Sequence, residues 1–191
     1  MIYGNSALFD ASMMQRHAAK PPQANIRQPR GTDGAKVWSL IGATATLDDN
    51  SLYCNLLQTT HFASTCAIAE IGEEVAGWVS GYIPPEKPDT LFIWQVCVGE
   101  AARGLGLGRR LIGDVLMRPA CRSVTALECT ITHDNEASWG LFGAIARRLD
   151  AQMRGIDMLD AHTHFEGRHD SEYVVRIGPF GPDAVERLTR A

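Results

Sequence analysis

Apolar and polar positions alternate with a strand-like period along several stretches of the chain. Residues 25–30 alternate like a short strand, and residues 64–85 predict two strands around a glycine-containing turn. Residues 88–100 are almost continuously apolar, which is typical of a strand in the middle of a sheet. Residues 123–132 predict a second buried strand, and residues 172–178 predict a terminal one.

Two helices are predicted between the first two strand regions. Thr32 is a suitable N-cap for a helix over residues 33–45, in which apolar residues recur at helical spacing: Val37, Leu40 and Ile41. Asn50 or Ser51 begins a second helix, which carries apolar residues on one side: Leu52, Leu56 and Leu57.

The second half of the chain has a glycine-rich turn followed by an amphipathic helix, and residues 135–149 predict another helix. Residues 157–170 are predicted as a loop. This order predicts an α/β (α+β) fold, a single domain whose central mixed, mostly antiparallel twisted sheet is flanked by helices. We place that domain at residues 25–178, between a flexible N-terminal arm, residues 1–24, and a C-terminal tail, residues 179–191.

Composition sets limits on the class of protein. The chain has 191 residues, of which 45% are hydrophobic, and a net charge of −4, so we expect neither nucleic acid nor an anionic membrane as a partner. No stretch is long and apolar enough to predict a membrane span, and the first residues do not resemble a signal peptide. The five cysteines form no Cys-x-x-Cys pair, which favours reduced thiols in a cytoplasmic protein.

The glycine-rich turn predicts a site for an anion. Arg103-Gly104-Leu105-Gly106-Leu107-Gly108-Arg109 opens a helix, whose first N–H groups have no partner within the helix. The turn fits neither the dinucleotide-binding fingerprint nor the Walker A loop. It does fit an Arg/Gln-x-x-Gly-x-Gly/Ala turn, in which the amides of Leu105 to Arg109 point at a pyrophosphate.

This turn lies between "FIWQVCV" and "ITHDNEASWGLF", and together these segments resemble the GCN5-related N-acetyltransferase superfamily over about residues 25–178. The resemblance implies that acetyl-coenzyme A is the cosubstrate. It also implies that the cofactor-binding residues are Val96, Val98, Arg103, Gly104, Leu105, Gly106, Leu107, Gly108, Arg109, Asn135 and Ser138. For Asn135 the alternative is a helix cap.

Three longer segments resemble one family within that superfamily. "LDDNSLYCNLLQTTHFASTCAIAE", "PPEKPDTLFIWQVCV" and "LECTITHDNEAS" are similar to the L-2,4-diaminobutyrate acetyltransferases of ectoine synthesis. The resemblance implies an enzyme that forms N4-acetyl-L-2,4-diaminobutyrate by direct attack of the amine on the thioester. It also implies a cytoplasmic homodimer that serves osmoadaptation.

The family analogy gives the N–H of Val96 as the donor to the thioester carbonyl. In many superfamily members a tyrosine protonates the departing thiolate, but Phe142 stands at that position here. Tyr53 or solvent is the remaining proton source, or coenzyme A leaves as the thiolate. Glu128, on a buried strand, is a candidate general base, with a structural carboxylate as the equal alternative.

The remaining candidates concern the substrate. We expect Asp48, Tyr53, Trp94 and Glu172 to bind it, with an N-cap as the alternative for Asp48 and a core position as that for Trp94. Arg27, Arg30 or a backbone nest are open as partners for the substrate carboxylate. We predict no metal, because the loop histidines follow no ligand pattern: His162, His164 and His169.

Two other functions stay open at this point. One is acetylation of a different small amine, such as a polyamine or an antibiotic, on the same scaffold. The other is a non-catalytic module that binds acyl-coenzyme A, because a fold alone does not determine function.

Overall fold

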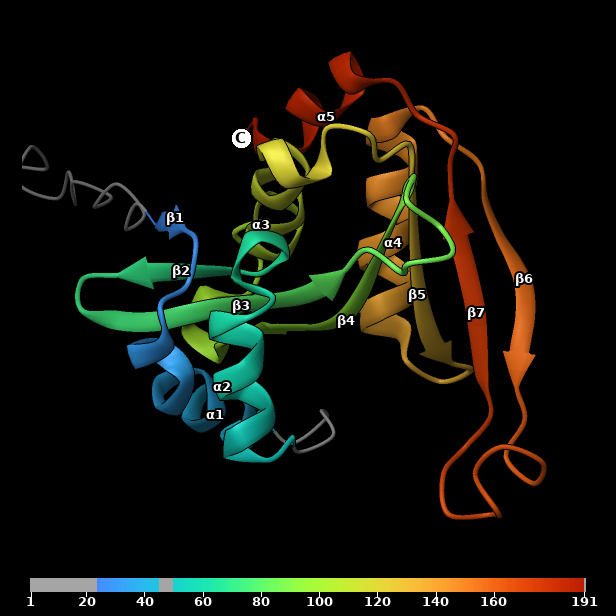
Figure 1. Ribbon diagram of the computed structural model, residues 1–191, viewed down its shortest axis with the longest axis horizontal. Coiled ribbons are helices and arrows are strands. Elements are labelled where there is room, and N and C mark those ends of the chain that lie inside the picture. The colour runs from blue at the N-terminus through green and yellow to red at the C-terminus, as the bar shows by residue number, and fades with distance from the viewer. Residues whose placement is uncertain (1–23, 45–49, 191) are drawn as a thin grey trace, which may run out of the picture.

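The computed structural model describes residues 24–44 and 50–190, which form a seven-stranded sheet in the order β1-β2-β3-β4-β5-β7-β6. Every neighbouring pair is antiparallel except β4 and β5, which are parallel (Figure 1). The predicted mixed, mostly antiparallel sheet is confirmed. The strands are β1 (Asn25–Arg27), β2 (Ala67–Ile71), β3 (Glu74–Tyr82), β4 (Thr90–Val98), β5 (Ala126–Thr132), β6 (Met153–Leu159) and β7 (Glu172–Ile177).

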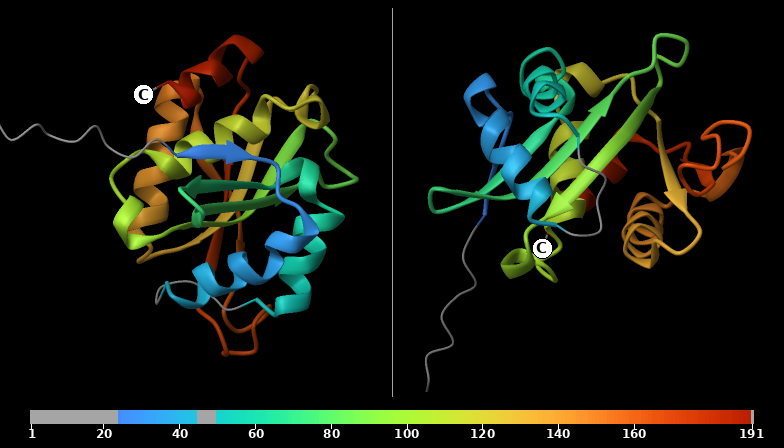
Figure 2. Two further views of the ribbon diagram at one scale, coloured as in Figure 1. Left: turned by 90° about the vertical axis from the view of Figure 1, so that its left-hand side faces the viewer. Right: turned by 90° about the horizontal axis from the view of Figure 1, so that it is seen from below.

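Helices cover both faces of this sheet (Figure 2). One core cluster joins Val37 and Ile41 of α1 to Trp78 on β3. The larger cluster joins α3, α4 and α5 to the opposite face. The α-helices are α1 (Gly34–Gly42), α2 (Leu52–Thr60), α3 (Leu107–Leu116), α4 (Glu136–Leu149) and α5 (Pro182–Thr189), and the short 3-10 turns are η2 (Gly31–Asp33), η3 (Ala63–Thr65), η4 (Glu100–Ala102) and η5 (Pro119–Cys121).

The start of α2 is as predicted, but its buried side is not. Ser51 is the N-cap, and its hydroxyl accepts a hydrogen bond from the N–H of Cys54 at 3.1 Å. The side that carries Leu52 and Leu56 is not the buried one, because the buried residues are Asn55, Gln58 and Thr59. The amide nitrogen of Asn55 donates to the side-chain oxygen of Gln58 at 3.1 Å, and the hydroxyl of Thr59 donates to the carbonyl of Asn55 at 3.0 Å. Within the described residues, Oδ1 of Asn55 and Nε2 of Gln58 are buried without a partner.

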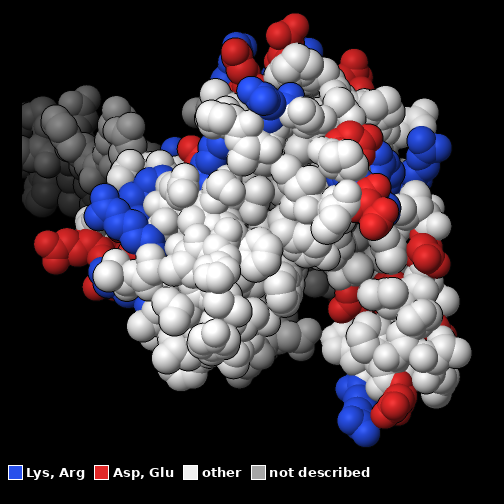
Figure 3. Space-filling model, in the orientation of Figure 1, with Lys and Arg blue, Asp and Glu red and all other residues white. Residues whose placement is uncertain are grey.

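Helix α2 packs closely against α1, because a Cβ on Gly34 would lie only 3.3 Å from the Cα of Leu56. Leu52 and Leu56 are nevertheless exposed, at 49% and 39%. Figure 3 shows that the face over α1 and α2 carries few charges.

The first helix begins later than predicted. Thr32 lies inside the 3-10 turn η2 rather than at an N-cap, and α1 follows from Gly34. The side chain of Asp33 accepts instead from the backbone N–H of Arg30 at 2.7 Å. Asp33 thus ends η2 and is at the same time the residue that precedes α1.

Two elements were missed in the sequence. Residues 153–159 form the edge strand β6, paired with β7, where part of a loop was predicted. Most of β6 is exposed, so it has no buried alternation to reveal it. The expected C-terminal tail contains α5, which buries Ala184, Val185 and Leu188 against α3 and α4. Residues 1–23 of the predicted arm lie outside the described residues.

Arg27 holds three elements together. It bonds to Asp33 at 2.8 Å and to Glu70 at 2.5 Å, linking β1 to η2 and β2. Burial opposes ionisation of Asp33, but hydrogen bonds from Arg27 and from the N–H of Arg30 hold its pKa below the usual value. The hydrogen bond from Arg27 likewise lowers the pKa of Glu70. Arg27 is thus engaged within the fold rather than held for a substrate carboxylate.

We expect Arg27→Gln to lower the free energy of unfolding by about 2 kcal/mol at pH 7. Both carboxyls have lowered pKa values in the folded chain. This stabilisation is therefore complete above the ordinary carboxyl pKa of about 4, and it is lost as the pH falls through the lowered pKa values of the folded chain. Urea unfolding at pH 7 and pH 3 measures the difference between the variant and the original chain. An equal loss at both pH values would contradict this account.

Candidate active site

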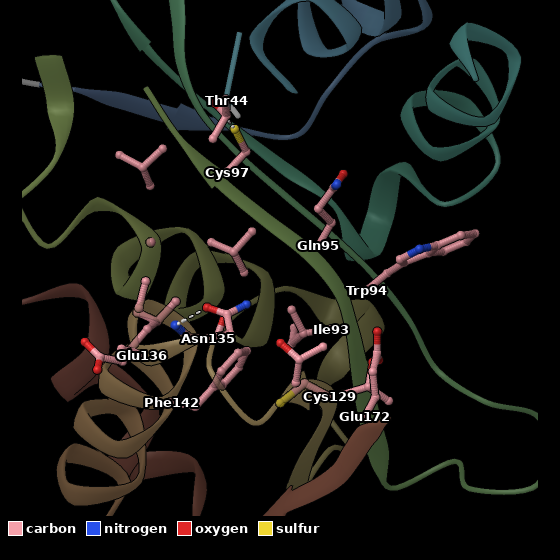
Figure 4. A pocket seen from close by; sticks show the side chains of 18 of the residues that line it. Thr44, Ile93, Trp94, Gln95, Cys97, Cys129, Asn135, Glu136, Phe142 and Glu172 are labelled. Carbon is pink, nitrogen blue, oxygen red and sulfur yellow. Dashed lines mark hydrogen bonds between the residues drawn. The ribbon is translucent and has the colours of Figure 1, made fainter. Parts of the chain in front are cut away.

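A cleft opens where β4 and β5 separate. The two strands pair only from Thr90 with Ala126 to Ile93 with Cys129, and β4 continues for five more residues beyond that point. A cavity of about 1660 Å³ occupies the gap (Figure 4). Its walls come from β4, the glycine-rich turn, the first turns of α4 and the loop between β6 and β7.

The edge of β4 presents to this cleft backbone groups that have no strand partner, although Nε of Arg103 donates to the carbonyl of Val98 at 3.5 Å. The N–H of Gly99 donates to the carbonyl of Ala76, and bonded pairs alternate along an antiparallel ladder. The alternate residues Val96 and Val98 therefore direct their N–H and C=O groups away from β3. In the described part of the chain no strand pairs with β4 on that side beyond Ile93. Both residues line the cavity, as predicted.

The glycine-rich turn forms the next wall. Gly104 and Gly106 have φ values of 79° and 66°, a left-handed conformation that side chains rarely adopt. Gly106 is the N-cap of α3, so the amides of Leu107, Gly108 and Arg109 begin the helix without partners inside it. These three residues line the cavity together with Arg103, Gly104 and Gly106.

Two residues of this turn lie differently from their neighbours. The side chain of Leu105 is 39% exposed, and the residue is not among those that line the cavity. Arg109 lines the cavity, but its guanidinium is buried, and Nη1 donates to backbone carbonyls at the end of α5. Its neighbour Arg110 points to the carbonyl of Ala24, at 3.4 Å. The turn thus offers an anion the open amides of the helix start, with Arg103 beside them in the cavity wall.

The start of α4 faces the turn across the cleft. Asn135 and Ser138 both line it, and the side-chain oxygen of Asn135 accepts from the N–H of Ser138 at 3.0 Å. Asn135 therefore caps the helix while it borders the cavity. Phe142 is buried and also lines the cavity, so its ring offers no proton there.

Trp94 lies between this cavity and a smaller one. It has no partner on β3, because the register shifts from Ser80 paired with Gln95 to Gly81 paired with Ile93. A second cavity of about 350 Å³ is lined by Phe62, Tyr82, Phe92, Trp94, Thr130 and Leu159. Trp94 and Thr130 line both cavities, so the smaller, mainly apolar one adjoins the cleft. Trp94 is 49% exposed and is not a core residue.

Glu172 is the predicted carboxylate that the structure brings to the cleft. It begins β7 and lines the large cavity. The imidazole Nε2 of His169 lies 3.7 Å from its carboxylate and comes from the loop that forms the adjoining wall. The cleft thus has one wall of backbone amides and an acidic group on another element.

Glu128 is placed differently. Its side chain is 4% exposed, and its two oxygens accept hydrogen bonds from Arg176 at 2.7 Å and Lys87 at 2.8 Å. It lines neither cavity. Its geometry is that of the structural alternative, a buried carboxylate neutralised by two cations.

The other two substrate candidates are not brought to the described walls. Tyr53 is 67% exposed on α2 and lines neither cavity. Asp48 lies outside the described residues, which stop at Thr44 and resume at Asn50. Thr44 and Asn50 themselves line the large cavity.

Sequence reasoning missed Cys129, which lines the cavity where β4 and β5 part. Burial raises its pKa to about 12, so it stays a neutral thiol near pH 7. Its alternation with Glu128 along β5 was the available signal that the two residues face opposite sides of the sheet. A neutral thiol is a poor nucleophile, which favours direct transfer over a covalent thioester on this chain.

Within residues 24–44 and 50–190, no cluster of His, Cys, Asp and Glu is arranged to hold a metal ion. Over the same residues, no helix is both long and apolar enough to span a membrane.

Comparison with known proteins agrees with this geometry. The sequence model of the acetyltransferase (GNAT) family matches residues 37–145. The solved structure of diaminobutyrate acetyltransferase EctA from Paenibacillus lautus, in complex with L-2,4-diaminobutyric acid and coenzyme A, superposes with a TM-score of 0.80 at 34% identity, covering 85% of this chain and 98% of that one. Ard1 from Thermoplasma volcanium, with a TM-score of 0.65 at 16% identity, shares the fold and covers 81% of this chain and 97% of its own.

Sequence relatives are closer still. The L-2,4-diaminobutyric acid acetyltransferase of Methylotuvimicrobium alcaliphilum is 47% identical over 159 residues, which are 83% of this chain and 92% of the relative. That of Chromohalobacter salexigens is 49% identical over 161 residues, covering 84% and 83%. With this identity over most of the length of its relatives, and with the same fold, the chain belongs to the L-2,4-diaminobutyric acid acetyltransferases of the GNAT family.

Proposed function

We propose that this enzyme transfers the acetyl group of acetyl-coenzyme A to L-2,4-diaminobutyrate and forms N4-acetyl-L-2,4-diaminobutyrate for ectoine synthesis. The observation that carries the proposal is the cleft between β4 and β5, where backbone groups of β4 that have no strand partner meet the open amides of α3. One strand edge and one helix start can hold the two ends of the same extended cofactor. The relatives named for this reaction support the choice of substrate.

In this proposal the pyrophosphate of coenzyme A binds to the turn Arg103–Arg109, where helix amides and the helix dipole favour an anion. The pantetheine arm extends along β4 and bonds to Val96 and Val98 like an added strand. The N–H of Val96 then donates to the thioester carbonyl and stabilises the negative charge that develops on its oxygen. Asn135 and Ser138 border the arm from α4.

The amine approaches from the side of Trp94 and Glu172. The carboxylate of Glu172 pairs with an ammonium group of the diamine, and Asp48 is a further proposed substrate contact. One ammonium must lose a proton to solvent before attack, because only the neutral amine is a nucleophile. Its nitrogen then bonds to the acetyl carbon and gives a second proton to solvent, the carbon–sulfur bond breaks, and coenzyme A leaves as the thiolate beside Phe142.

We also propose a homodimer that works in the cytoplasm and supports osmoadaptation. Several apolar residues on and after α2 are exposed within a face that has few charges: Leu52, Tyr53, Leu56 and Phe62. An uncharged apolar face of this kind is typical of a protein interface, and a second copy of the chain is the proposed occupant. Light scattering of the purified chain measures its mass directly.

Product analysis tests the reaction. We expect NMR of the product to show the acetyl group on the terminal nitrogen, because the terminal amine is the group acetylated in the family's pathway. Release of coenzyme A with ornithine, lysine and spermidine should be at least about tenfold slower, since a pocket loses roughly 1–3 kcal/mol with each mismatched methylene. Acetylation of the α-nitrogen, or faster turnover of another amine, would indicate a different acetyltransferase.

Replacement of Gly108 tests the cofactor turn. A Cβ on Gly108 would already lie 3.4 Å from Val96 and from Leu141, so Gly108→Val should push these side chains into the cleft and abolish binding of acetyl-coenzyme A in calorimetry. Gly140→Val is the matched control, because a Cβ there meets nothing within 4 Å and the residue does not line the cavity. Original affinity in the Gly108 variant, with an unchanged melting curve, would refute the assignment.

A change of glutamate to glutamine, made at Glu172 on β7 or at Glu128 on β5, tests the roles of the two carboxylates separately. Glu172→Gln should raise KM for the diamine about ten- to a hundredfold, because it removes a charge-assisted hydrogen bond worth roughly 1.5–3 kcal/mol. Glu128→Gln should leave KM and kcat within about twofold but lower the free energy of unfolding by roughly 3 kcal/mol, since Arg176 loses its buried partner. A large loss of kcat in the Glu128 variant alone would restore Glu128 as the general base.

A further inference from the structure

The C-terminal helix is tied to the cofactor turn by one buried arginine. The guanidinium Nη1 of Arg109 donates to the carbonyl of Arg187 at 3.3 Å, to that of Arg190 at 2.7 Å, and to that of Leu188. These carbonyls lie at the end of α5, where the helix itself cannot satisfy them. A cation there also faces the negative end of the helix dipole.

Close packing fixes both ends of the contact between Arg109 and α5. A Cβ on Gly113 of α3 would lie 2.8 Å from the Cβ of Leu188, so α5 packs very closely on α3. Leu188 is completely buried. At the other end of the contact, the guanidinium of Arg109 lies against the turn itself, because a Cβ on Gly106 would be 3.2 Å from its Nη2. A shift of α5 would therefore move the guanidinium of Arg109, which lies against Gly106.

Arg109 occupies the third position of α3, one of those whose amides face the cleft. Its backbone thus belongs to the anion-binding turn, while its side chain belongs to the contact with α5. Breaking that contact frees a buried cation and the first turn of α3 together. The amides of Leu107 and Gly108 then lose one of the contacts that fix their orientation, the contact of Arg109 with α5.

We propose that Arg109 is a positioning residue through which α5 sets the affinity of the turn for coenzyme A. This inference rests on the proposed function, which places the pyrophosphate at this turn. Because coupling between two sites is reciprocal, coenzyme A must also stabilise the docked α5. The C-terminal helix is in this way part of the cofactor site although it does not line the cleft.

Three variants test the proposal. Arg109→Met keeps an unbranched side chain but removes every hydrogen-bond donor. We expect its Kd for coenzyme A to rise about tenfold at 15 °C. Its kcat at saturating acetyl-coenzyme A and its KM for the diamine should stay within about twofold of the original values. Arg109→Lys, which retains a cation and can reach fewer carbonyls, should recover most of the affinity. Arg148→Met is the control, because Arg148 also bonds to the carbonyl of Arg187, at 3.2 Å, but from the surface of α4.

The control separates positioning from stability. Arg148→Met should lower the melting temperature without changing Kd for coenzyme A. An unchanged Kd in Arg109→Met, with only a lower melting temperature, would overturn the proposal, and so would an equal rise of Kd in both variants.

A measurement on the original chain keeps the test valid should Arg109→Met not fold. Coenzyme A should slow hydrogen exchange at the amides of α5 as well as at those of Leu107–Arg109. Protection of the turn without any protection of α5 would refute the coupling while leaving the cofactor turn intact. If neither segment is protected and Gly108→Val binds coenzyme A normally, the proposed cofactor site itself is wrong.

Discussion

The divergence of β4 from β5 is the constraint on which the rest of the site depends. Two parallel strands that pair for four residues and then separate leave the N–H and C=O groups of Val96 and Val98 without a strand partner. The carbonyl of Val98 accepts from Nε of Arg103 at 3.5 Å, and the other groups are costly to bury unpaired, so water or a ligand must meet them. An extended chain with its own amides, such as pantetheine, provides bonds that the missing strand would have made. The cleft is therefore an interrupted sheet that a cofactor can complete.

The glycine-rich turn follows from the same geometry. The chain leaves β4, passes through η4 and must begin α3 so that its first amides reach the gap. Gly104 and Gly106 make this turn through left-handed conformations. Gly108 has no such conformation, and its role is spatial, because a side chain there would contact Val96 across the cleft. Three glycines in one motif thus serve two different physical requirements.

Local patterns predicted most of the sheet and the cofactor wall, since strands β2 to β5, the turn and α4 have strong periodicity or turn chemistry of their own. The misses share a cause. α2 packs against α1 with Asn55 buried and Leu56 exposed, and β6 exists because β7 pairs with it. For Arg109, the sequence places the residue in the motif but does not show that α5 folds back to take its side chain. Contacts between distant segments decide each of these outcomes.

The arrangement of charge around the cleft explains how one site can receive two different ligands. Arg27, Arg109 and Arg176 are each engaged by acceptors of the fold, so these three guanidinium groups are not directed at the phosphates. The turn offers the amides of its helix start, with Arg103 as a full positive charge beside them. Glu128 is neutralised within the sheet, whereas Glu172 borders the cavity. A cationic diamine can therefore bind near the carboxylate on β7, which is a different element from the turn that attracts the anion, and this separation lets the amine and the thioester meet in the same cleft.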